Sequence, residues 1–193
     1  MLRTALPWLA LLVIALVGLS LLDQPAPRLI SNIQVARSEF PHAFMENIET
    51  LEFDAQGHLR YRMNTPSGRY FQKDPEKPGN EDYSLVDQPQ VVFYPANSTA
   101  PWQLRAELGY VRADGQHLRL DQGVEAEQAS PSQGLIQVET ESLSIHPTRQ
   151  YAETDKAVKM RAQLGQLETL GMRAYLSEDR IELLSNVKGT YAP

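Results

Sequence analysis

The sequence contains 193 residues, of which 42% are hydrophobic and 22% are charged, and its formal net charge is −6. It contains no cysteine, which excludes a disulfide framework, thiolate metal sites, cysteine nucleophiles and a lipid-modified N-terminal cysteine. The acidic balance argues against nucleic acid as a partner, because contacts to phosphates need a basic surface. The length suits one domain with a short appendage.

An uncharged apolar run stands near the front of the chain, from Ala5 to Leu22. At ~1.5 Å per residue, a helix of this length nearly spans the roughly 30 Å hydrocarbon core of a bilayer. Arg3 precedes the run and Asp23 follows it, so the positive-inside rule keeps the N-terminus in the cytoplasm and exports the rest. A cleaved signal peptide is the alternative, but the run ends in residues as bulky as Leu21, where a cleavage site needs small ones.

This reading divides the chain into three parts. Residues 1–22 are expected to form a transmembrane signal anchor, residues 23–40 a short linker, and residues 41–193 an exported domain. The linker contains Pro25 and Pro27, and its shortness places the domain close to the membrane surface.

From about Ile48 onward, apolar residues alternate with polar ones, which is the pattern of half-buried β-strands. The alternation is clearest in Leu51–Phe53, Leu59–Met63, Val91–Phe93, Trp102–Tyr110 and Leu118–Leu120. Turn sequences at Asp54–Gly57 and Asp114-Gly115 indicate hairpins, and no convincing helical stripe follows residue 40. The pattern predicts an all-β domain, an antiparallel sandwich or open barrel, with Tyr70–Asp82 as an exposed loop.

The second half contains a weak internal repeat of strand, turn and strand. Each copy ends in a small or turn-prone residue followed by valine, at Gly123-Val124, Ala157-Val158 and Asn186-Val187. A single hairpin cannot bury its apolar face alone, so stacked copies must share a core. Chance similarity among hairpins is the alternative origin of the pattern. The alternation changes phase between Val138 and Leu143, where we expect a β-bulge.

The order and spacing of five short segments carry a family resemblance. They are the apolar run 5–22, the hairpin Thr50–Gly57, and the segments Asp87–Pro89, Gly123–Glu125 and Leu170–Arg173. With these segments in this order, nearly the whole chain resembles the LptC family, the bitopic periplasmic component of the lipopolysaccharide transport machinery of Gram-negative bacteria. Compared with the family pattern, the Tyr70–Asp82 loop is enlarged.

The resemblance implies a twisted, slightly open β-jellyroll of OstA-like hairpin repeats with an apolar interior. It implies that lipopolysaccharide, extracted by an inner-membrane ABC transporter, passes through this interior to a periplasmic bridge protein of the same fold. The anchor helix and the N-terminal edge would contact the transporter, and the C-terminal edge would contact the bridge protein. The implied location is the inner membrane, with one pass, a cytoplasmic N-terminus and a periplasmic domain.

The large apolar residues on the inward faces are the candidate lipid groove. They are Ile48, Leu51, Phe53, Leu59, Tyr61, Met63, Val86, Val91, Phe93, Trp102, Leu104, Leu118, Leu120, Ile136, Val138, Met160, Met172 and Ile181. Each buried methylene group contributes ~0.8 kcal/mol, so partial burial of several acyl chains would hold the lipid firmly. Because the domain and lipopolysaccharide are both negatively charged, we expect the groove to bind acyl chains and not phosphates. A filled, dry sandwich core is the alternative, which alternation alone does not distinguish.

The last predicted strand, Arg180–Val187, is followed by only a few residues. We therefore expect its edge to be open for pairing with a strand of a partner. A short tail that folds back over the edge is the alternative. The candidate edge residues are Ile181, Leu183, Val187 and Tyr191.

The sequence contains no catalytic constellation, so we expect no enzyme activity, cofactor or metal. The four histidines are scattered without metal-ligand spacing, at His42, His58, His117 and His146. We expect His58 and His117 to be solvated in turns, and the acidic pairs Glu81-Asp82 and Glu178-Asp179 to be solvated charges. Two other functions stay open: a structural adaptor that never contacts lipid, and an anchored carbohydrate-active enzyme, which would need two carboxylates about 5–10 Å apart in a groove.

Overall fold

The computed structural model describes residues 40–74, 76–96, 100–130, 134–163 and 165–191. The chain divides into two compact units, Met1–Glu39 and Phe40–Pro193, and the described residues all belong to the second. The predicted anchor at residues 1–22, and the predicted linker apart from its last residue, lie outside the described residues. Within the described ranges, no helix is long and apolar enough to cross a membrane.

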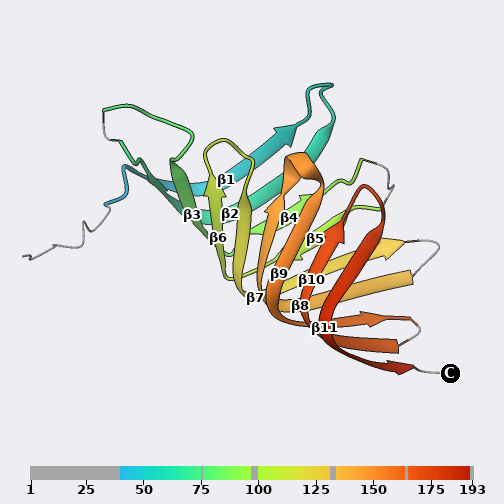
Figure 1. The fold of residues 1–193 in the computed structure, drawn as a ribbon. Coiled ribbons are helices and arrows are strands. Elements are labelled where there is room, and N and C mark those ends of the chain that lie inside the picture. The colour runs from blue at the N-terminus through green and yellow to red at the C-terminus, as the bar shows by residue number, and fades with distance from the viewer. Residues whose placement is uncertain (1–39, 75, 97–99, 131–133, 164, 192–193) are drawn as a thin grey trace, which may run out of the picture. The chain divides into compact units, whose positions relative to one another are not determined.

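The described part of the second unit forms one sheet of eleven strands, all paired antiparallel (Figure 1). The strands are β1 (Ala43–Phe53), β2 (Leu59–Phe71), β3 (Tyr83–Asp87), β4 (Gln90–Phe93), β5 (Trp102–Arg105), β6 (Leu108–Arg112), β7 (Leu118–Ser130), β8 (Gly134–His146), β9 (Tyr151–Ala162), β10 (Gly165–Tyr175) and β11 (Arg180–Tyr191). A short 3₁₀ helix, η1 (Pro147–Arg149), connects β8 to β9. The predicted all-β, antiparallel class is confirmed.

The sheet is divided along its strands into two halves. β3 and β4 lie end to end along β2, and β6 and β5 lie end to end along β7. β3 pairs with β6, and β4 pairs with β5, so two half-sheets share the long strands. We call them the β3 half-sheet and the β4 half-sheet. β8 to β11 contribute to both, and β1 and β11 are the edge strands (Figure 1).

The long strands bend together where the two half-sheets meet. The pairing register shifts between Asp121 and Val124 in β7, between Thr140 and Ser144 in β8, and next to Gly171 in β10. Each shift lies opposite the next one along the sheet, so the bend runs as a row across the strands. The structure has a register shift between Thr140 and Ser144, in the part of β8 where the bulge was expected between Val138 and Leu143.

Left-handed backbone conformations mark the same row. The φ angles are 67° at Gln122, 69° at Gly123, 83° at Gly171 and 52° at Asn186. Such residues break the regular pleat and turn the strand. Gly123, Ala157 and Asn186, the residues that precede valine in the sequence repeat, all lie in this row. The repeat therefore records the position of the bend in β7, β9 and β11.

Buried threonine side chains form hydrogen bonds with backbone groups along the bend. They are Thr65, Thr140, Thr154 and Thr169. Thr140 Oγ1 donates to the carbonyl of Ala157 at 2.9 Å, and Thr169 Oγ1 donates to the carbonyl of Ser185 at 2.8 Å. Buried backbone groups need a partner, and a threonine hydroxyl can supply one locally. Side-chain hydrogen bonds therefore stabilise the bend.

The bend also corrects one predicted strand. Trp102–Tyr110 was expected to be one strand with one apolar face, but β5 and β6 are separate strands with Ala106 and Glu107 between them. Leu104 is buried in the core, whereas Tyr110 pairs with the exposed Arg119 on the opposite face. Alternation alone does not reveal such a change of face, because both segments keep a period of two.

A buried carboxylate organises the loop between β2 and β3. Asp82 is 1% exposed; it accepts hydrogen bonds from the Tyr70 hydroxyl at 2.6 Å and from the backbone N–H groups of Lys73 and Gly79, each at 2.9 Å. The Tyr70 bond, followed by the two backbone bonds, lowers the pKa of Asp82 below its ordinary value. The expectation of a solvated charge is therefore wrong for Asp82, and Tyr70 itself belongs to β2.

Replacing the bend glycines by alanine should destabilise the fold in a graded way. Gly123→Ala should cost about 1–2 kcal/mol, because a Cβ is disfavoured at positive φ although no heavy atom lies within 4 Å of it. Gly171→Ala should cost more, because its Cβ would also lie 2.8 Å from Cδ1 of Leu184. Urea unfolding of the full-length protein measures both costs.

Gly79→Ala is the matched control. Gly79 is a loop glycine outside the positive-φ set, and its Cβ would lie 4.0 Å from the nearest backbone oxygen. It should change stability by less than about 0.5 kcal/mol. Equal stability of the Gly123→Ala and Gly79→Ala variants would contradict the assignment of strain to the bend.

Candidate functional site

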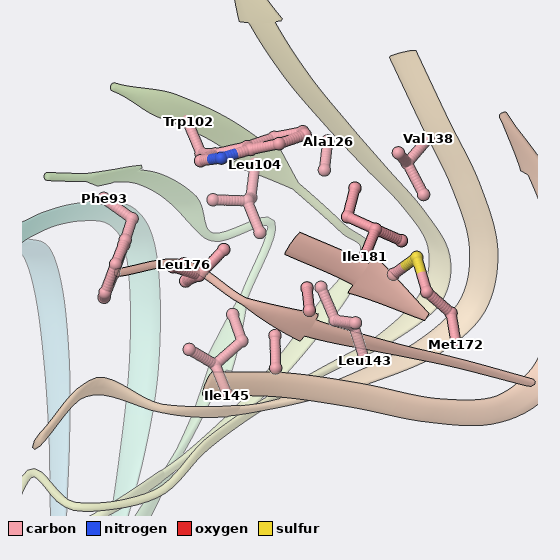
Figure 2. Close-up of a pocket in the computed structure, with 12 residues that line it drawn as sticks. Phe93, Trp102, Leu104, Ala126, Val138, Leu143, Ile145, Met172, Leu176 and Ile181 are labelled. Atoms are coloured by element: carbon pink, nitrogen blue, oxygen red, sulfur yellow. The ribbon is translucent and has the colours of Figure 1, made fainter. Parts of the chain in front are cut away.

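An apolar crevice lies between the two half-sheets. It is lined by Phe93, Trp102, Leu104, Ala126, Val138, Leu143, Ile145, Ala152, Met172, Ala174, Leu176 and Ile181. Figure 2 shows the labelled side chains converging from the facing strands into a common space. Its volume is about 40 Å³, and apart from the indole nitrogen of Trp102 its lining side chains are entirely hydrocarbon or thioether. Such a surface offers dispersion contacts and no hydrogen-bonding pattern.

The bend is what creates two facing walls from a single set of strands. In β8, Val138 precedes the bend and lies in the β4 half-sheet, whereas Leu143 and Ile145 follow it and lie in the β3 half-sheet. All three nevertheless line the crevice. Residues a few positions apart in one strand therefore face each other across the cavity (Figure 2).

Most of the residues predicted for the groove lie on the buried inner face. Six of them line the crevice itself: Phe93, Trp102, Leu104, Val138, Met172 and Ile181. Six more belong to the buried core around it: Tyr61, Met63, Val86, Val91, Leu118 and Leu120. Three are half-buried and pack against that core: Ile48, Ile136 and Met160. Leu59 is half-buried but lies outside the core cluster.

Leu51 does not face inward, so its predicted orientation is wrong, whereas Phe53 follows a register shift after Glu52, pairs with Leu59 and is exposed at the edge of the sheet. Leu51 and Phe53 are 42% and 49% exposed, and Leu51 pairs with the exposed Arg62. The neighbouring residue, Glu52, pairs instead with the buried Tyr61. On this edge strand Leu51 lies on the outer face although Ile48 packs against the core, so hydrophobicity alone does not predict the face of an apolar residue.

Sequence reasoning missed half of the lining residues. They are Ala126, Leu143, Ile145, Ala152, Ala174 and Leu176. The alanines are too small to stand out as groove residues, and Leu143 and Ile145 follow the phase change in β8. Leu176 lies in the turn between β10 and β11, where period-two alternation does not apply.

The apolar inner face continues to the free edge of the sheet. Ile181 and Leu183 pack against the core from β11. Further along the same strand, Val187 and Tyr191 are 51% and 69% exposed. By their register with β10 they lie on the inner face as well. The apolar wall is therefore covered in the middle of the sheet and uncovered at its C-terminal edge.

The outer face of the β4 half-sheet has the opposite character. Cross-strand ion pairs join Arg105 to Glu125 and Arg161 to Glu139. These exposed pairs add little stability each, but they give the outer surface a polar, mixed-charge cover. The apolar surface of this half-sheet is thus concentrated on the face that lines the crevice.

A row of stacked aromatic rings crosses the β3 half-sheet. It consists of Phe71, Tyr83, Tyr110, His117, His146, Tyr151 and Tyr175, with neighbouring ring centroids 5.0–6.0 Å apart. The guanidinium of Arg180 lies 3.8 Å from the Tyr175 centroid and closes the row. Because the rings stack on one another, their faces are not free to stack on a ligand. The row links strands β2 to β11.

His117 was expected to be solvated, but the structure has its side chain half-buried. Its ring stacks on His146 at 5.1 Å, and burial, with a smaller contribution from the charge of His146, lowers the pKa of His117. The expectation is confirmed for His58, whose side chain is exposed, and for the exposed pair Glu178-Asp179. Within the described part of the chain, no cluster of three or more His, Cys, Asp or Glu side chains is arranged to hold a metal ion.

The lowered pKa of His117 predicts a pH dependence of stability. The unfolded chain binds a proton near the usual pKa of 6.5, whereas the folded state binds it only at lower pH. This contribution is therefore complete above the usual pKa and is lost as the pH falls through 6.5 towards the folded-state value. His117→Phe keeps a ring in the row and removes the titration.

Urea unfolding between about pH 7.5 and about pH 5.5, where carboxylates remain ionised, tests this prediction. We expect the variant to lose less stability than the natural protein over this range. Tyr110→Phe is the control, because it alters a neighbouring ring of the same row and keeps the imidazole of His117, so the slope should stay as in the natural protein. Identical slopes for all three proteins would contradict the assignment.

A crystal structure of LptH from Pseudomonas aeruginosa, described as the LptA-homologous periplasmic component of the conserved lipopolysaccharide transport device, matches with a TM-score of 0.49 and 9% sequence identity. The match covers 67% of this chain and 96% of that chain. No curated protein sequence matches this chain. The family model described as lipopolysaccharide-assembly, LptC-related, matches residues 8–192. Since this match spans almost the entire sequence, the chain belongs to the LptC-related family of lipopolysaccharide-assembly proteins.

Proposed function

We propose that this protein is a membrane-anchored conduit for lipopolysaccharide. Residues 1–22 would anchor it in the inner membrane with a cytoplasmic N-terminus, residues 23–40 would act as a short linker, and residues 41–193 would lie in the periplasm as a slightly open β-jellyroll. The domain would receive lipopolysaccharide extracted by an inner-membrane ABC transporter. It would then pass the lipid to a periplasmic bridge protein on its C-terminal edge.

The apolar crevice between the half-sheets is the observation that carries this proposal. Apart from the indole nitrogen of Trp102, its lining offers contacts for hydrocarbon and none for phosphate or sugar. Burying methylene groups contributes ~0.8 kcal/mol each, so an acyl chain that enters gains affinity in small, reversible steps. A conduit needs this property, because it must accept its cargo and also release it.

The charge of the chain also supports binding of the lipid through its acyl chains and not through its head group. The net charge of −6 repels the anionic head group of lipopolysaccharide, and the outer face of the β4 half-sheet has a mixed-charge cover. The lipid would therefore be held by its acyl chains, with phosphates and sugars in water. The proposal needs no catalytic step, and ATP hydrolysis by the transporter would supply the energy.

The uncovered apolar residues of β11 support a bridge partner at that edge. Val187 and Tyr191 continue the crevice wall and are exposed. A strand added to β11 would cover them and prolong the apolar face without interruption. The edge residues Ile181 and Leu183 pack against the core and would hold β11 in place for pairing with that partner.

A structural adaptor that never contacts lipid is the second candidate function. The small size of the crevice favours it, since about 40 Å³ is far below the about 300–1,000 Å³ of typical ligand pockets. In that case the inner face would be only a core, and the partner edge would be the functional surface. Direct capture of lipid at inner positions separates the two functions.

Site-specific photo-crosslinking tests the conduit. A photoreactive residue at Phe93, Leu104 or Ile181 should capture lipopolysaccharide in cells while the transporter is active, because these side chains line the crevice. The matched control is Gln103, which lies between two inner residues of β5 and is exposed. Capture at Gln103 alone, or at no inner position, would rule out the conduit and leave the adaptor.

A proline in the edge strand tests the partner contact. Leu183→Pro removes a backbone donor from β11, so we expect loss of co-purification with the periplasmic bridge protein and unchanged membrane insertion. Leu183→Ala keeps the donor and should retain the partner. If the proline variant co-purified the partner at the natural level, the C-terminal edge would not be the contact.

A further inference from the structure

The crevice is too small for its proposed cargo in the structure as it stands. Pockets that enclose ligands measure about 300–1,000 Å³, and this cavity measures about 40 Å³. An acyl chain fits only if the two half-sheets separate. Contacts between the rims of the two half-sheets, which are the strand ends farthest from the bend, therefore decide whether the crevice can open.

One such contact is made by the side chain of Gln150. Gln150 follows η1 at the rim of the β3 half-sheet, and its Oε1 accepts a hydrogen bond from the backbone N–H of Ala96 at 3.0 Å. Ala96 follows β4, the strand that carries the crevice residue Phe93 along the rim of the other half-sheet. This hydrogen bond therefore joins the two rims.

The backbone of Gln150 holds a second element over the crevice. Its carbonyl accepts a hydrogen bond from the N–H of Leu176 at 2.8 Å. Leu176 lies in the turn between β10 and β11, and its side chain lines the crevice (Figure 2). One residue thus fixes both the opposite rim and the turn that places Leu176 in the cavity.

The conformation of Gln150 is itself held by its neighbours. The residue is left-handed, with φ 52° and ψ 45°, and its backbone N–H donates to the carbonyl of Pro147 at 3.2 Å. Its side-chain Nε2 lies 3.4 Å from the same carbonyl. Pro147 is buried, so its carbonyl is held in place and orients the side-chain amide of Gln150 towards Ala96.

We propose that Gln150 is a latch that controls the access of acyl chains to the crevice, and this inference rests on the proposed conduit function. In the latched state, the bond to Ala96 keeps the rims together and Leu176 occupies the cavity. Breaking that bond frees the rims, and the half-sheets separate about the row of bent strands that contains Gly123 and Gly171. Acyl chains then enter from the rim side.

The latch predicts a specific pattern among variants at this position. Gln150→Ala removes the acceptor, so the open fraction should rise about fivefold, the change expected from one net hydrogen bond. Gln150→Glu keeps an oxygen for the Ala96 N–H but loses the Nε2 contact to Pro147, so it should stay much closer to the natural protein than Gln150→Ala does. Gln88→Ala is the matched control, because Gln88 is exposed and has a φ of 49°.

Two readouts follow the latch in the full-length protein. Hydrogen exchange of the Ala96 amide, measured in phospholipid nanodiscs, should accelerate in Gln150→Ala and stay slow in Gln150→Glu and Gln88→Ala. Capture of lipopolysaccharide by a photoreactive residue at Phe93 should rise in Gln150→Ala when the transporter is inactive. An unchanged Ala96 exchange rate, or unchanged capture, would overturn the latch.

A reversible lock tests the same inference in the opposite direction. The chain has no natural cysteine, so Ala96→Cys with Gln150→Cys can be joined by a short bifunctional thiosulfonate and released with reductant. Capture at Phe93 should fall by about tenfold in the locked protein, because the cross-link lowers the fraction of molecules in the open state that binds acyl chains. Capture should return after reduction. Glu139→Cys with Arg161→Cys is the control, because that pair links β8 to β9 within one half-sheet.

The outcomes distinguish failure of the latch from failure of the proposed conduit function. If the unlocked protein captures no lipopolysaccharide at Phe93, Leu104 or Ile181, the conduit fails, and the latch fails with it. If the unlocked protein captures lipopolysaccharide and the locked protein captures it equally, only the latch fails. Loss of capture in the locked rim pair but not in the control pair supports both.

Discussion

The structure depends on one constraint, which is that the long strands must bend in the same row. A regular antiparallel sheet has one apolar face and needs another layer to cover it. Here the sheet covers itself, because left-handed residues such as Gln122, Gly123 and Gly171 turn the strands and bring two halves of the same face together. Buried threonine hydroxyls donate hydrogen bonds to backbone carbonyls along the bend. Core, crevice and rims all follow from this folding of one sheet.

The bend also explains which parts of the fold were predictable from the sequence. Period-two alternation identified the β class, the hairpin at Asp54–Gly57 and most inner positions, because each depends only on neighbouring residues. The repeat of a small residue before Val124, Val158 and Val187 was visible too, but its meaning was not. It marks a bend, and a bend is defined only by pairing between strands that are distant in sequence.

The failures have the same physical origin. Leu51 was assigned to the wrong face because an edge strand can place apolar residues outward, and only its pairing with Arg62 shows this. Ala152 and Ala174 were missed because a crevice needs small residues where two walls approach, and size alone does not predict that. The partial burial of His117 is not predictable from its position beside a turn, because it depends on stacking against His146 of β8. Asp82 was read as solvated for a similar reason: its partners become adjacent only when the loop folds.

A crevice that is apolar and nearly closed reconciles two requirements that compete. An empty cavity large enough for several acyl chains would destabilise the domain, because lost contacts and unfilled volume both cost free energy. A fully packed core would be stable but would exclude cargo. In the proposed conduit, two walls that pack against each other would avoid this conflict, since an entering acyl chain would replace wall-to-wall contacts with wall-to-lipid contacts. The net free-energy change would then be small in either direction, which suits the proposed transfer of lipid from one protein to the next. The rims, where Gln150 bonds Ala96, would then control access to the crevice, while the bend gives the crevice its shape.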